Sequence, residues 1–137
     1  MSTYVSERAR RLVAERAGHR CEYCRIRQID AFIGFEIDHT VAQKHGGGNE
    51  AGNLALACPQ CNAHKGTDLT TFLESYQDIV PLFNPRLHRW SSHFTTEGGL
   101  ILARTRIGQA TIKLLQFNDP DRIIQRSMLA EAGCWPD

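Results

Sequence analysis

Apolar residues near the N-terminus recur with the period of an α-helix. They are Ala9, Leu12, Val13 and Ala17. This spacing predicts a helix over residues 6–17 that packs its apolar side on a core. Ser6 is a suitable N-cap and Gly18 a suitable stop. Three of the four arginines of this segment, Arg8, Arg11 and Arg16, would then face outward.

The middle of the chain alternates short apolar and polar segments. Residues 35–38 alternate apolar and acidic side chains, which predicts a short strand. Residues 40–43 would continue that strand or return from it, and the glycine- and asparagine-rich run 45–53 predicts turns. A short apolar segment, 54–57, precedes a predicted helix that begins near Pro59 and ends near Gly66.

The second half of the chain predicts further short elements. Residues 69–76 are assigned to a short helix, and 78–83 to an extended segment because Pro81 and Pro85 disfavour helix. Residues 93–97 and 100–104 are expected to pair as a hairpin. Two helices should follow, one capped by Thr105 and one opened by Asp119 and Pro120. The last helix is expected to turn Ile123, Ile124, Met128 and Leu129 inward.

Composition places the chain among globular proteins. With 137 residues, 42% hydrophobic and 23% charged, it suits one domain with an appendage. No apolar run is long enough for a membrane span and no signal-peptide core is visible, so a cytoplasmic protein is expected. The net charge is only +1, but residues 1–30 hold seven Arg against four acidic residues. That basic excess favours a solvated helix face and a phosphate-binding surface equally.

Two Cys-x-x-Cys pairs, Cys21 with Cys24 and Cys58 with Cys61, are candidate metal ligands. Each pair places two thiolates where one tetrahedral ion can bridge them, and two pairs close the coordination sphere. A closed site is structural, and it would supply folding free energy to a loop-rich segment. The alternative is disulfides or free thiols, and disulfides are uncommon in the cytosol. Cys134 is expected to take no part.

The order of these features resembles the HNH endonuclease family. The matching elements are the two Cys pairs, Asp38-His39, Gly46-Gly47, Asn53-Leu54, and Asn62 with Lys65. The segments 81–86 and 89–94 also resemble a stand-alone bacterial subgroup, and Ala42 departs from the proline that many members carry. The resemblance implies an α+β fold with a zinc-stabilised ββα-metal core at 21–68, an N-terminal helix at 1–20 and a C-terminal extension at 69–137.

The resemblance also assigns roles to single residues. His39 would be the general base and Asn53 would brace its loop, while Asp38 and Asn62 would hold a catalytic Mg²⁺ or Mn²⁺ through oxygen. The four cysteines would bind one structural zinc. The expected nucleic-acid contacts are Lys65, His64, Arg8 and Arg11.

The implied activity is hydrolysis of nucleic-acid phosphodiesters, with DNA favoured and no obligate protein partner expected. Two alternatives stay open at this point. One is a non-catalytic, zinc-stabilised module that binds nucleic acid or protein, in which Asp38, His39 and Asn62 would be replaceable. The other is a nuclease directed to RNA.

Overall fold

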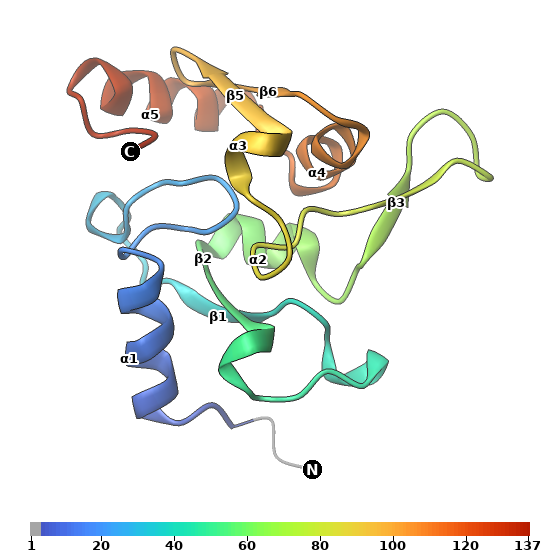
Figure 1. The fold of residues 1–137 in the computed structure, drawn as a ribbon. Helices are drawn as coiled ribbons and strands as arrows, with labels where there is room; N and C mark the ends of the chain where they lie inside the picture. The colour runs from blue at the N-terminus through green and yellow to red at the C-terminus, as the bar shows by residue number, and fades with distance from the viewer. Residues whose placement is uncertain (1–3) are drawn as a thin grey trace.

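The computed structural model describes residues 4–137, which form an α+β fold with three separate two-stranded antiparallel sheets (Figure 1). In chain order the helices and strands are α1 (Glu7–Arg16), β1 (Glu36–His39), β2 (Leu54–Ala57), α2 (Pro59–Lys65), β3 (Thr70–Phe72), β4 (Ile79–Pro81), α3 (Trp90–His93), β5 (Phe94–Glu97), β6 (Leu100–Ala103), α4 (Arg106–Leu115) and α5 (Pro120–Glu131). Short 3-10 turns lie at Gln28–Asp30, Gln43–His45 and Ala51–Asn53. No helix in the described part of the chain is long and apolar enough to cross a membrane.

Helix α1 forms where the apolar period predicts it. The Ser6 side chain accepts a hydrogen bond from the Ala9 amide, which caps the first turn. Val13 is fully buried and packs in a small cluster with Leu54 and Leu56 of β2. Leu12, expected on the same apolar face, is largely exposed instead. Helix α1 therefore packs against β2 through a narrower apolar face than its sequence suggests.

The central hairpin and α2 form the ββα arrangement (Figure 1). Strands β1 and β2 pair antiparallel, with Asp38 opposite Ala55 and His39 opposite Leu54. The partner of β1 is thus β2, and residues 40–43 neither continue the strand nor return along it. Helix α2 begins at Pro59, with Cys58 as its N-cap, and packs on both strands. The predicted zinc-stabilised α+β core is confirmed in its architecture.

The C-terminal part covers the other side of α2 (Figure 1). The predicted hairpin at 93–104 is confirmed as β5 and β6, and Thr105 caps α4 through the Gly108 amide. The expected helix at 69–76 is wrong, because β3 pairs with β4 in a projecting hairpin. The β-branched and aromatic residues Thr70–Phe72 suit a strand, and the extended segment at Ile79–Pro81 offers it a partner.

Helix α5 turns a different face inward from the one predicted. Ile124 and Met128 are 60% and 67% exposed, whereas Arg122 and Arg126 are 4% and 1% exposed. Both tryptophans fix the C-terminal part to the N-terminal loop by hydrogen bonds. The Trp90 indole donates to the Tyr23 carbonyl at 2.7 Å, and the Trp135 indole donates to the Cys24 carbonyl at 3.0 Å. Trp90 and Phe94 pack together, with Phe94 buried in the main core and Trp90 partly buried against it.

Candidate functional site

The four predicted cysteine ligands meet at one buried point. Their Sγ atoms all lie within 4.8 Å of one another, and the Cys24 and Cys58 sulfurs are 3.7 Å apart. None of the four forms a disulfide. A tetrahedral zinc with bonds of about 2.3 Å to sulfur would separate its ligands by about 3.8 Å. The spacing, the burial and the all-sulfur donor set therefore fit one structural zinc ion.

Local backbone geometry shapes each Cys pair for this purpose. The Cys24 amide points at the Cys21 sulfur at 3.5 Å, and the Cys61 amide points at the Cys58 sulfur at 3.4 Å. Hydrogen bonds from the neighbouring thiols lower the pKa of Cys24, while burial raises the pKa of Cys21 and Cys61. The fifth cysteine, Cys134, lies outside the cluster, as expected.

Asp38 occupies the buried side of β1. Its carboxylate accepts a hydrogen bond from the Tyr23 hydroxyl at 2.5 Å and pairs with the Lys65 ammonium at 3.2 Å. Burial raises the pKa of the Asp38 carboxyl, and the charge of Lys65 opposes that rise. Because a carboxylate has about four acceptor positions, these two partners leave capacity for a further ligand.

The Lys65 ammonium does not face solvent. The residue is 3% exposed, and its Nζ donates to the His39 carbonyl at 3.2 Å and the Thr40 carbonyl at 3.4 Å, besides contacting Asp38. The expected phosphate contact of Lys65 is therefore not available in this structure. The side chain instead ties α2 to the end of β1, where His39 and Asp38 stand.

His39 is the last residue of β1, where the strand ends, and it borders the same hollow as Asp38. Its Nε2 lies 2.7 Å from the Asn49 Oδ1. The Asn49 amide nitrogen donates to the Tyr4 carbonyl at 3.1 Å, which orients the amide oxygen toward the imidazole. Sequence reasoning missed Asn49, because an asparagine after three glycines gives only a turn signal.

Asn53 spans the loop between the two strands. Its Oδ1 accepts from the Thr40 hydroxyl at 2.8 Å and the Val41 amide at 3.0 Å. Its Nδ2 donates to the Val41 and Gly48 carbonyls, each at 2.9 Å. Gly47 lies so close beneath this network that a Cβ would meet the Val41 oxygen at 1.7 Å. The loop that follows His39 thus has one tightly determined conformation.

Asp38, His39 and Asn62 line one hollow of about 380 Å³ beside α2. The Asn62 amide donates to the carboxylate of Glu36, which precedes Asp38 by two residues and so shares its strand face. Glu36 was missed in the sequence, although this i, i+2 spacing was a usable signal. Oxygen donors from Asp38 and Asn62, with Glu36 adjacent, are the chemistry that Mg²⁺ and Mn²⁺ prefer, so the set fits a divalent ion.

The remaining predicted contacts lie apart from this hollow. His64 follows Asn62 on α2 and is partly exposed, and it does not line the hollow. Arg8 and Arg11 are exposed on α1. Arg16 of the same helix is used internally, because its guanidinium donates to the Leu54 carbonyl at 2.6 Å. Arg8 and Arg11 are therefore accessible to solvent, whereas the Arg16 guanidinium bonds within the protein.

An arginine from the C-terminal helix reaches the thiol cluster. The Arg122 Nη2 donates to the Cys61 sulfur at 3.0 Å, and its Nη1 donates to the Leu115 carbonyl at 2.7 Å. No local pattern predicts this contact, because an arginine in an amphipathic helix is ordinarily assigned to the solvent face.

Comparison with known proteins agrees with the geometry. Residues 21–68 match the family model described as HNH endonuclease. No curated protein and no solved structure matches the chain significantly. The matched segment begins at the first zinc-type cysteine, contains β1, β2 and α2, and ends just beyond Lys65. Residues 21–68 of this chain are therefore similar to an HNH endonuclease domain, and their four cysteines are placed as a possible zinc site.

Proposed function

We propose that this protein is a metal-dependent endonuclease that hydrolyses phosphodiester bonds, in DNA by preference, with His39 as the general base. The observation that carries the proposal is that His39, Asp38 and Asn62 line one hollow within the HNH segment. Similarity to this family by itself indicates nuclease activity on nucleic acid. The base, the metal ligands and the choice of DNA belong to this proposal.

The contact between His39 and Asn49 supports a specific protonation state. The Asn49 Oδ1 is an acceptor only, so the His39 Nε2 carries the proton and donates it. The neutral imidazole then keeps Nδ1 free to accept a proton from water. A neutral imidazole held in this way is a suitable general base for a water molecule. Asn49 thus orients the ring and selects its tautomer.

The other residues hold this base in place. Lys65 fixes the His39 carbonyl, and Asn53 fixes the loop that follows it. Asp38 and Asn62 would hold the divalent ion, which supplies charge stabilisation for the phosphoryl group and its leaving oxygen. Arg8 and Arg11 supply sequence-independent contacts to the phosphate backbone.

A substrate survey tests the proposal against its two alternatives. Zinc-loaded protein, cleared of other divalent ions, is incubated with supercoiled plasmid or with RNA of matched sequence, with and without Mg²⁺ or Mn²⁺. The proposal predicts plasmid cleavage that depends on the added ion. Preferential cleavage of RNA would change the substrate class. Binding of nucleic acid with no cleavage under any condition would replace the nuclease by a binding module.

A further inference from the structure

Two buried arginines lie on the inner face of α5, one turn apart. Arg122 and Arg126 are 4% and 1% exposed, and in the described part of the chain neither makes an ion pair with a carboxylate. Removing an unpaired cation from water costs several kcal/mol, so both positions need compensation from the groups around them. Those groups differ between the two arginines.

The buried charge of Arg126 is compensated by hydrogen bonds to neutral oxygen atoms. It donates to the Gly99 and Phe117 carbonyls at 2.8 and 2.7 Å and to the Asn118 side-chain oxygen at 3.2 Å. Burial lowers the pKa of Arg126 to about 10, consistent with a cation that has no negative partner in contact. Arg126 therefore anchors α5 to the β5–β6 hairpin and the chain after α4.

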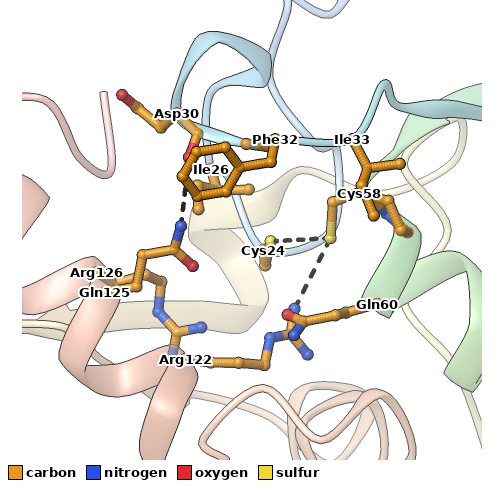
Figure 2. A pocket seen from close by; sticks show the side chains of 12 residues that line it. Cys24, Ile26, Asp30, Phe32, Ile33, Cys58, Gln60, Arg122, Gln125 and Arg126 are labelled. Atoms are coloured by element: carbon orange, nitrogen blue, oxygen red, sulfur yellow. Dashed lines mark hydrogen bonds between the residues drawn. The ribbon is translucent and has the colours of Figure 1, made fainter.

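The buried charge of Arg122 is compensated in part by the sulfur atoms of the thiol cluster. Its Nη1 donates to the Leu115 and Gln116 carbonyls, at 2.7 and 3.1 Å, and its Nη2 faces Cys61 at 3.0 Å and Cys58 at 4.0 Å. Burial by itself lowers the pKa of Arg122, but the Cys61 and Cys24 thiols raise it above the usual value. Figure 2 shows the guanidinium beside the Cys58 sulfur, with Cys24 next to it.

The charge of the cluster explains why a cation is placed here. Four thiolates and one Zn²⁺ carry a net charge of about −2 in a buried site. A guanidinium that donates to those thiolates balances part of this charge through charge-assisted hydrogen bonds and so stabilises the metal-bound cluster. Cys24 and Cys58 also border a hollow of about 210 Å³, so the cluster is not sealed on that side. Arg122 and Arg126 both contribute to the wall of this hollow.

We propose that Arg122 is a positioning residue of the zinc site, which donates a hydrogen bond to the bound thiolates and slows the release of zinc. The site of the HNH segment 21–68 is thus completed by a residue from α5, about sixty residues farther along the chain. Through this contact the C-terminal part controls how long the nuclease core keeps its ion. The inference rests on the zinc site formed by the four cysteines and not on the proposed catalytic roles.

Zinc release from purified full-length variants tests the role of Arg122. Wild type, Arg122→Met and Arg122→Lys are loaded with zinc, and transfer of the ion to a chromogenic chelator is followed over time. The matched control is Arg126→Met, which removes the neighbouring buried arginine of the same helix but no thiolate contact. Arg122→Met should release zinc at least about tenfold faster than wild type, in line with the usual cost of losing a partner of a metal ligand. Arg126→Met should stay within about twofold of wild type when both are folded.

The absorption spectrum of Co²⁺-substituted protein tests the hydrogen bond itself, because the spectrum would not change if Arg122 only supported the fold. Loss of a hydrogen bond to sulfur makes the thiolate a better electron donor, so the sulfur-to-cobalt charge-transfer band should shift to lower energy in Arg122→Met and Arg122→Lys only. Equal release rates and bands in wild type and Arg122→Met would overturn the inference, as would equal effects in Arg126→Met. If Arg122→Met does not fold, the Arg122→Lys comparison decides by the same criteria. Wild type that takes up no zinc would instead refute the zinc site itself.

Discussion

Replacing Lys65 by methionine should destabilise the protein more than any exposed lysine substitution. The ammonium contacts both Asp38 carboxylate oxygens, at 3.2 and 3.3 Å, and two backbone carbonyls. Methionine fills similar space but leaves Asp38 with the Tyr23 hydroxyl as its remaining side-chain partner. Burial already raises the pKa of Asp38, and removal of the Lys65 charge should raise it further. Breaking one side of a buried ion pair costs about 3–5 kcal/mol.

A double substitution separates the lost ion pair from lost packing. In Asp38→Asn with Lys65→Met no charge is buried, and the asparagine oxygen can still accept from Tyr23. The two effects should therefore fall short of additivity by about 0.5–3 kcal/mol. The free energy of unfolding is measured by urea denaturation of zinc-loaded protein at neutral pH. Lys44→Met, at an exposed position on the loop after His39, is the control and should change stability by less than about 0.5 kcal/mol.

The reasoning would be refuted if Lys65→Met cost less than about 1 kcal/mol, the range of an exposed ion pair. It would also be refuted if the double variant were destabilised by the full sum of the single changes.

Three further predictions follow from other contacts. Asn49→Ala should slow plasmid cleavage, whereas Asn49→Asp keeps an oxygen acceptor for the His39 Nε2 and should cleave faster than Asn49→Ala. Equal cleavage rates of the two variants would argue against selection of the His39 tautomer by Asn49. Gly47→Ala should lower the free energy of unfolding by about 1–3 kcal/mol because its Cβ collides with backbone, whereas Gly52→Ala meets nothing within 4 Å and should be nearly neutral. Burial and neighbouring His88 lower the pKa of His93, so the unfolded chain takes up the proton first and the free energy of unfolding should fall as pH drops below about 6.5. In urea titrations at pH 7.5 and 5.5, His93→Gln should reduce this loss of stability, and an unchanged loss would contradict the prediction.

The sequence predicted those features that are set by short-range spacing. The two Cys-x-x-Cys knuckles, the Ser6 cap and the Gly98-Gly99 hairpin each depend on residues only a few positions apart. The helix that begins at Pro59 also depends on a local preference. Such local preferences can be read from the sequence without knowledge of the tertiary packing.

The features that were missed depend on partners far along the chain. Lys65 was expected to contact nucleic acid, but Asp38, 27 residues away, provides a buried counter-charge for it. The inner face of α5 was predicted as apolar because the thiol cluster that accepts Arg122 is not visible in the sequence of that helix. Thr70–Phe72 became a strand only because Ile79–Pro81 lies beside it.

Plasmid cleavage by wild type and His39→Ala, with zinc content measured on both, tests the central proposal most directly. Equal zinc would show that the fold around the cysteine cluster is intact in the variant. Loss of a general base should then slow cleavage by about 10²–10⁴-fold in the presence of Mg²⁺ or Mn²⁺. Cleavage at the wild-type rate by zinc-loaded His39→Ala would contradict the proposal that His39 is the general base of this protein.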